Sequence, residues 1–169
     1  MKLELLRPQG PEEIARIWSE FHADESKGRV GAVISSAQYA QIHRHGPESP
    51  VFVLPVPKPE GYVTMLVQFQ LPIVMVTTLD DYRTRGVNAA SHLVLTHYTE
   101  LASDKNLVLV RGDVLVNSAV NVFEARDVIK KVHHLNSDPT AYAKWPYTFN
   151  HNSTSFSFTD YLAELGFKK

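Results

Sequence analysis

The chain has 169 residues, a length that suits one domain with enough interior for a hydrophobic core. Its formal net charge is −1, from 17 basic and 18 acidic residues. It therefore lacks the general positive field that attracts nucleic acid or an anionic membrane, and neither is expected as a partner. Cysteine is absent, which excludes disulfides, a thiol nucleophile and a thiolate metal site.

The N-terminal stretch shows no targeting or membrane signal. It contains acidic residues, Pro8 and Pro11, and it lacks the arginine-rich amphipathic pattern of a transit peptide. No apolar run in the chain reaches the ~18 residues that a membrane-spanning helix needs, so membrane insertion is not expected. We expect residues 1–169 to form a single domain in which residues 1–10 are a loose lead.

The first helix is predicted to begin at Pro11, because the N–H that proline lacks would have no partner at the first helical position. A short buried strand is predicted at residues 30–34. Ser35 or Ser36 then caps a second helix, which the pair Gly46-Pro47 is expected to end. The inward face of the first helix is expected to carry Ile14, Ile17, Trp18 and Phe21.

The next stretch predicts most of a sheet. Residues 51–56 lie among three prolines, which cannot donate to a sheet ladder, so they are expected to form an edge strand or an extended arm. Residues 63–69 alternate between apolar and polar, which indicates a strand with one buried face. Gln70-Leu71-Pro72 is expected to turn the chain, and residues 73–79 to return as an apolar strand.

Residues 82–101 are predicted to form the main core helix, with Thr84 as its N-cap. The apolar residues of this stretch follow one another at spacings of 3, 4, 4 and 3, which on a helix form a single stripe. The stripe consists of Val87, Ala90, Val94, Tyr98 and Leu101.

Residues 107–116 predict another strand, in which Gly112 marks a bulge or a close approach by another backbone. A further long helix is expected to start near Asn117 or Ser118. Phe123 falls on its charged face, where we expect the tail or a loop to cover it. The inward stripe of this helix is Val122, Ala125, Val128, Ile129, Val132 and Leu135.

The C-terminal part is rich in aromatic residues. Four of them crowd a predicted loop broken by Pro146, where they either seal the end of the core or form a partner contact. They are Tyr142, Trp145, Tyr147 and Phe149. A short helix at residues 158–165 ends at Gly166. The whole pattern predicts an α+β fold, with a mostly antiparallel central sheet of about five strands packed by three long helices and a short C-terminal helix.

Motifs for chemistry are missing from the sequence. It contains no GxxxxGK[ST] phosphate loop, no dinucleotide GxGxxG, no GxSxG elbow and no HExxH zinc helix. The spacing of His43 and His45, and of His92 and His97, offers no convergent set of metal ligands. We therefore expect no catalytic residues, no bound metal and no cofactor.

Several short segments, spread in order over most of the chain, form a recognisable set. They are Ile17-Trp18, Gly31-Ala32-Val33-Ile34, residues 52–57, Glu60-Gly61-Tyr62, Thr84-Arg85-Gly86, Ala89-Ala90-Ser91, Leu93, Leu95, His97-Tyr98, Glu100-Leu101 and Ala163-Glu164-Leu165. Through these segments the sequence resembles the mitochondrial ATP synthase F(1) complex assembly factor 1 family. The turn Gln70-Leu71-Pro72 departs from the glycine-containing turn of that family.

This resemblance implies a non-enzymatic assembly chaperone that holds the unassembled F(1) β subunit by the surface that the α subunit later covers. It also implies the mitochondrial matrix as the location, with a presequence that is not in this chain. From patterning alone, we predict polar contacts from Arg83, Arg85 and Asn88. Apolar contacts are predicted from Phe123, Trp145, Tyr147 and Phe149.

Two other classes of function stay open at this stage. One is a small enzyme whose site combines distant residues, such as His97 with Asp80, Asp81 or Glu100. The other is a generic protein-interaction or ligand-binding domain with a different partner. A cleft with a histidine bonded to a carboxylate would favour the enzyme, and capture of another partner would favour the interaction domain.

Overall fold

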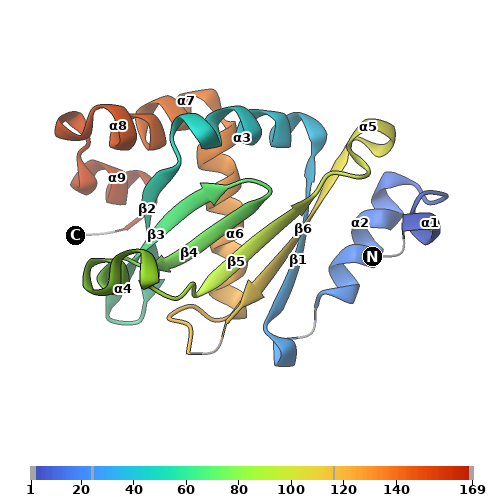
Figure 1. Ribbon diagram of the computed structural model, residues 1–169, viewed down its shortest axis with the longest axis horizontal. Helices are drawn as coiled ribbons and strands as arrows, with labels where there is room; N and C mark the ends of the chain where they lie inside the picture. Colours follow the sequence, from blue (N-terminus) through green and yellow to red (C-terminus); the bar gives the residue numbers. More distant parts are fainter. Residues whose placement is uncertain (1–2, 24, 116, 168–169) are drawn as a thin grey trace.

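A computed structural model describes residues 3–23, 25–115 and 117–167. Its centre is one six-stranded antiparallel sheet in the order β1-β6-β5-β4-β3-β2, flanked by helices on both faces (Figure 1). The strands are β1 (Arg29–Ser35), β2 (Val51–Lys58), β3 (Gly61–Gln70), β4 (Ile73–Thr78), β5 (Leu93–Tyr98) and β6 (Leu107–Val114). The α-helices are α1 (Leu3–Leu6), α2 (Pro11–Phe21), α3 (Ser36–Glu48), α4 (Leu79–Arg85), α5 (Ala102–Lys105), α6 (Val122–Ser137), α7 (Pro139–Lys144), α8 (Pro146–His151) and α9 (Phe158–Glu164). The 3-10 helices are η1 (Glu25–Lys27), η2 (Gly86–Asn88) and η3 (Ser153–Ser155). The α+β prediction is confirmed, with one strand more than expected.

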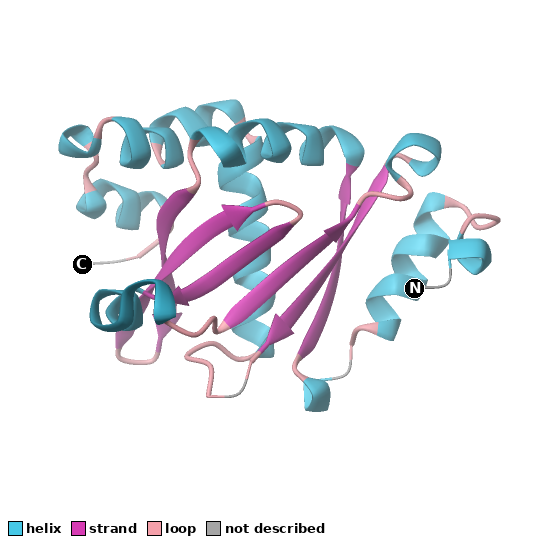
Figure 2. Cartoon of the chain, viewed as in Figure 1, coloured by secondary structure: helices cyan, strands magenta, loops and turns pink. Residues whose placement is uncertain are grey.

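The helices divide between the two faces of the sheet. Helix α6 lies behind the sheet, whereas α4 lies in front of it and α2 lies beside β1 (Figures 1 and 2). Helix α2 begins at Pro11 as predicted, and it buries Ile14 and Trp18 against β6 and the α5 segment. Phe21, expected on the same inward face, is instead 74% exposed.

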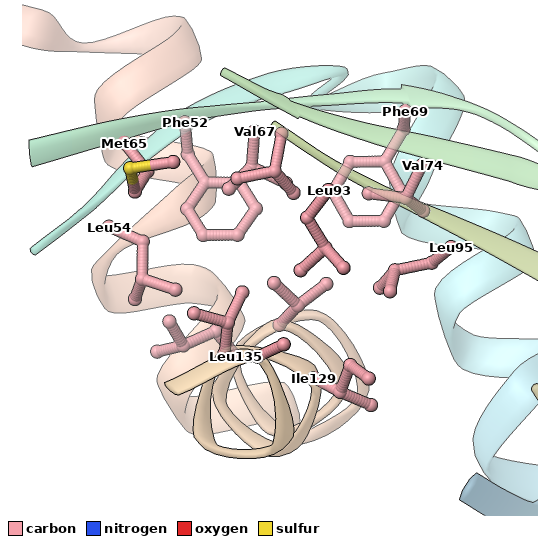
Figure 3. Close-up of a cluster of buried hydrophobic side chains, with 14 of the residues drawn as sticks. Phe52, Leu54, Met65, Val67, Phe69, Val74, Leu93, Leu95, Ile129 and Leu135 are labelled. Atoms are coloured by element: carbon pink, nitrogen blue, oxygen red, sulfur yellow. The ribbon is translucent and has the colours of Figure 1, made fainter. Parts of the chain in front are cut away.

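Helix α6 forms the main packing partner of the sheet. All six residues of its predicted inward stripe are buried, so that prediction is confirmed. Side chains from β2, β3, β4 and β5 point toward Ile129 and Leu135 of this helix (Figure 3). The helix begins at Val122, later than expected, because Asn121 accepts from the Glu124 N–H while the Glu124 side chain accepts from the Asn121 N–H.

The predicted helix at residues 82–101 is wrong. The stretch contains the end of α4, then η2 and strand β5, and the chain reverses at Gly86 with φ 58° and ψ −132°. In β5 the side chains alternate between buried and half-buried, with Leu93, Leu95 and His97 inward. Pairing with β4 and β6 selects the strand over the helical spacing that the same residues also fit.

The N-cap of α4 is Thr78, whose hydroxyl accepts from the Asp81 N–H at 3.1 Å. Thr84, the predicted cap, lies within the helix and donates its hydroxyl to the Asp80 carbonyl at 2.9 Å. Because the strand β5 begins at Leu93, the helix before it has to end earlier than predicted, and it also starts earlier, at Leu79, directly after its cap.

Two smaller expectations also change. Helix α3, capped by Ser35, continues through Pro47 to Glu48, and the Ser49 N–H closes its last turn on His45. The strand at Gly112 has an unbroken register, so it contains no bulge, and the nearest neighbours of Gly112 are the side chains of Ile129 and Leu95 and not another backbone. Val116, the last residue of that predicted strand, lies outside the described residues.

The aromatic loop is in fact the pair of short helices α7 and α8, with Pro146 at the first position of α8. Tyr142 and Trp145 are buried, so these two do seal the end of the core. Phe123 is not covered as expected, since it is 64% exposed with only the Arg126 guanidinium over its ring. The short helix before Gly166 is confirmed as α9.

A buried histidine pair links β5 to α6. The Nδ1–H of His97 donates to the Pro72 carbonyl at 2.9 Å, so its Nε2 accepts from the Nε2–H of His133 at 2.9 Å. Both rings are 3% exposed. Burial lowers the pKa of His133 to about 3, with a smaller contribution from His97, and burial also lowers the pKa of His97. The pair is therefore neutral in the folded protein at neutral pH.

This pair predicts a loss of stability in acid. Below the ordinary histidine pKa of 6.5, the unfolded chain binds protons that the folded pair does not, so the free energy of unfolding falls as pH decreases toward about 3. Each such histidine contributes a slope of about 1.4 kcal/mol per pH unit. Urea unfolding of His133→Gln should show a shallower slope than the parent between pH 6.5 and 4.5, and exposed His43→Gln is the control. Equal slopes in parent and His133→Gln would contradict the assignment.

Candidate partner-binding surface

The segment made of α4 and η2 projects from the front of the sheet (Figure 1). Its side chains combine two arginines and an amide with two apolar groups, and Val87 at the tip is 93% exposed. We call this set the α4 surface, and its members are Tyr82, Arg83, Arg85, Val87 and Asn88, all exposed. Asp80 and Asp81 of the same helix balance the two arginines. A polar surface of mixed charge with an apolar tip suits contact with another protein better than it suits chemistry.

Local hydrogen bonds hold the α4 surface on the sheet. Thr78 caps the start of the helix, and Thr77 donates its hydroxyl to the Ala90 carbonyl at 2.8 Å. Between these two ends, Gly86 adopts a backbone conformation that costs little only for glycine. The exposed side chains are therefore carried on a fixed support at both ends.

A partly buried polar network, which we call the His92 network, joins this support to three other segments. His92 Nε2 bonds to Asp81 Oδ2 at 2.7 Å, and the Ala119 N–H donates to His92 Nδ1 at 2.8 Å. Lys58 Nζ donates to the Ala119 carbonyl at 2.5 Å and to Glu124 at 2.8 Å. The network thus ties α4 to the start of β5, to the segment before α6 and to the end of β2.

The histidine–carboxylate pair in this network resembles part of a catalytic site, but its geometry excludes a general base. Because the Ala119 N–H occupies Nδ1, the ring proton is on Nε2 and is donated to Asp81. The bond from His92 lowers the pKa of Asp81, and the Thr78 hydroxyl lowers it further. Neither ring nitrogen is available to take a proton from a substrate.

The other groups considered for chemistry do not converge either. His97 is buried, and both of its ring nitrogens are engaged, by Pro72 and by His133, rather than by Asp80, Asp81 or Glu100. Among the residues that the structure describes, no group of three or more histidine, aspartate or glutamate side chains could hold a metal ion.

The predicted contact residues do not form one surface. Arg83, Arg85 and Asn88 share the α4 surface, whereas Phe123 lies on the first turn of α6 and Tyr147, 41% exposed, lies on α8. Trp145 is only 5% exposed and packs against Tyr161 and Phe156.

Phe149 packs against Phe156 and is half-buried at the border of the core. The sequence reasoning missed Val87, because the helical stripe placed it inward, and it missed the bond between Asp81 and His92. The available signal for Val87 was its position directly after Gly86, where a helix commonly ends.

Comparison with known proteins places this arrangement in a family. The model of the family described as ATP11 protein matches residues 1–159. The chain belongs to the ATP11 protein family. Three curated relatives carry the name ATP synthase mitochondrial F1 complex assembly factor 1: the human protein is 30% identical over 164 residues, that of Danio rerio 29% over 166, and that of Mus musculus 29% over 164.

These alignments cover 96–98% of this chain but 49–54% of the relatives, so the chain spans about half the length of the proteins it matches. Within the described ranges, no helix combines the length and the apolar character that crossing a membrane requires. The similarity extends over α4, η2 and the His92 network, since all of them lie within the matched residues.

Substitution of Gly86 tests the support of the α4 surface. Gly86→Ala should lower the free energy of unfolding by about 1–3 kcal/mol, because the added Cβ meets no atom within 4 Å but the backbone conformation becomes strained. Gly10→Ala is the matched control, since Gly10 has an ordinary φ of −74° and equally open surroundings. Denaturant unfolding measures both, and equal losses would show that strain at Gly86 is not the cause.

The His92 network predicts a second stability effect. His92→Ala leaves the Ala119 N–H without its acceptor, so we expect a loss of about 1–3 kcal/mol in denaturant unfolding and faster amide exchange at Ala119. Asp81→Asn is the milder comparison, because the amide oxygen still accepts from His92. An unchanged exchange rate at Ala119 in His92→Ala would contradict this role for the ring.

Proposed function

We propose that this protein is an assembly chaperone that binds the unassembled F1 β subunit of ATP synthase in the mitochondrial matrix. The observation that carries the proposal is the match to proteins named as F1 complex assembly factors over nearly the whole of this chain. The geometry supports it, because α4 and η2 present an exposed surface that combines charged groups of both signs with an apolar tip.

The proposed mechanism is shielding followed by competition. An unassembled ring subunit exposes apolar surface that associates with further copies of itself. A chaperone that covers the α-facing surface of β blocks this route, provided that the α subunit binds β more tightly and displaces it. Release then needs no nucleotide and no reaction by the chaperone.

The α4 surface is the proposed main contact. Arg83, Arg85 and Asn88 provide polar matching, and the exposed Val87 provides apolar area at the tip. Phe123 and Tyr147 add two exposed aromatic rings outside the α4 surface. Trp145 and Phe149 offer little free surface, so in this proposal they act mainly by holding α8 in place.

The test uses isolated β subunit. The parent chain should suppress aggregation of β in light scattering and should co-elute with it, because it covers the surface that self-associates. The triple variant Arg83→Glu, Arg85→Glu, Val87→Ser should bind β at least tenfold more weakly, as expected when a contact centre is removed. Isothermal titration calorimetry measures the change.

The matched control is Arg44→Glu with Lys130→Glu, which reverses two exposed charges on α3 and α6. It should bind β within about twofold of the parent if binding depends on where the reversed charges lie and not on the net charge of the chain. Failure of the parent chain to suppress aggregation or to co-elute would defeat the proposed function. Equal weakening by both variants would defeat the assignment to the α4 surface.

A further inference from the structure

The two edges of the sheet differ in how their outward main-chain groups are satisfied. At the β2 edge, the Phe69 N–H bonds to the Pro50 carbonyl, and this register directs the odd-numbered residues of β2 away from β3. Asn150 bonds to both the N–H and the carbonyl of Val51, and the Tyr161 hydroxyl donates to the Val53 carbonyl.

The remaining outward positions of β2 are Pro55 and Pro57, which have no N–H to offer. Asn150 therefore closes this edge at Val51, the Tyr161 hydroxyl occupies the Val53 carbonyl, and proline leaves no donor at positions 55 and 57. Such protection is a common means of preventing a strand edge from pairing with another chain.

The β1 edge has no comparable protection. The Val114 N–H bonds to the Gly28 carbonyl and the Ser36 N–H bonds to the Asn106 carbonyl, so the even-numbered residues of β1 face β6. Arg29, Gly31 and Val33 consequently direct their N–H and carbonyl groups outward. Within the described residues these main-chain groups have no hydrogen-bond partner. The strand contains neither proline nor lysine.

The surroundings of this edge form a slot between two helices. Gly31 packs beneath α2, whereas Val30 belongs to the core that α6 covers, so the two helices flank opposite faces of β1. An open pocket of about 310 Å³ at this point is lined by Gly31, by the end of α2 and by Arg126 of α6. Gly31 has no side chain, so its half-exposed surface is main chain.

Two exposed aromatic rings adjoin the slot through residues that line it. The Phe21 ring, on a side chain 74% exposed, lies 4.9 Å from that of His22, and Phe123, 64% exposed, lies under the Arg126 guanidinium. Glu20 also lines the slot and shares Arg16 with Glu13, whereas Arg126 has no carboxylate partner among the residues that the structure describes. The slot thus offers main-chain hydrogen bonds, apolar flanks and a cation.

We propose that the free edge of β1 binds an extended segment of the client subunit, which adds to the sheet as a seventh strand and carries apolar side chains and a carboxylate. This inference rests on the proposed function for the identity of the client. The main-chain groups of Arg29, Gly31 and Val33 pair with the segment, and Arg126 pairs with its carboxylate.

Charge selects such a segment over a second copy of this chain. Two β1 edges paired antiparallel about Gly31 would bring the two Arg126 side chains toward each other at the centre of the contact. Like charges across an interface are unfavourable, whereas an acidic and apolar strand is complementary to the slot.

Residue-resolved amide exchange of the parent chain, free and bound to isolated β subunit, tests the main-chain pairing. The N–H groups of Gly31 and Val33 should exchange quickly in the free chain and at least tenfold more slowly in the complex. The N–H groups of Val30 and Ala32 already face β6, so they serve as internal controls that are protected in both states. Unchanged exchange at Gly31 and Val33 in a complex that does form would overturn the proposal.

Two variants test the edge by affinity. Val33→Pro removes an outward N–H without removing a bond to β6, and it should weaken binding of β about tenfold or more. Val33→Thr keeps the N–H and the branched shape, and it should bind like the parent. Arg126→Glu, on the helix surface, should weaken binding tenfold even if Val33→Pro fails to fold.

The outcomes separate this inference from the proposed function. If the parent binds β and both Val33→Pro and Arg126→Glu bind equally well, the β1 edge is not the site although the chaperone function stands. If the parent does not bind β at all, the proposed function itself fails. A dimer of the parent in light scattering that Val33→Pro abolishes would overturn the inference in favour of a second copy.

Discussion

The structure depends on one constraint: the apolar back face of a six-stranded antiparallel sheet must be covered, and helix α6 covers it. Its six inward residues lie against strands from both halves of the sheet. Burying each Val or Leu of such a stripe stabilises the fold by about 1.5–3 kcal/mol. The His97–His133 bond makes the same contact directional, because it fixes one point of the helix over one point of β5. The front of the sheet is thereby left for α2 and α4.

Sequence patterns predicted an element correctly where the apolar residues fitted only one periodicity, helical or strand-like. The stripe of α6, the alternation in β3, the Pro11 start of α2 and the Ser35 cap all followed from local chemistry. The failure at residues 82–101 has a physical cause. Val94 and Tyr98 fit a helical stripe, while Leu93, Leu95 and His97 fit an alternating strand, and pairing with β4 and β6 decided between them. Both of those strands lie outside residues 82–101, so a short sequence window over that stretch does not contain the pairing partners.

The candidate site divides in the same way. Arg83, Arg85 and Asn88 are exposed, although the helix predicted at residues 82–101 did not form. Charged and amide groups remain at the surface whether the stretch is one long helix or a short helix followed by a strand. Exposure of the aromatic residues could not be predicted, since it depends on distant packing. Trp145 is buried by Tyr161 and Phe156 of the C-terminal segment, whereas Phe123 has the Arg126 guanidinium over its ring and stays largely exposed.

The contrast between the two sheet edges would suit the proposed chaperone, which must release its client. A strand added to an edge exchanges hydrogen bonds with water for hydrogen bonds with protein, so each bond contributes only about 0.5–1.5 kcal/mol net. A few such bonds at Gly31 and its neighbours, with two exposed rings and one cation, would give an affinity that a larger native interface can exceed. Asn150, Tyr161 and proline occupy or remove several of the outward main-chain groups of β2, which would favour pairing at the β1 edge.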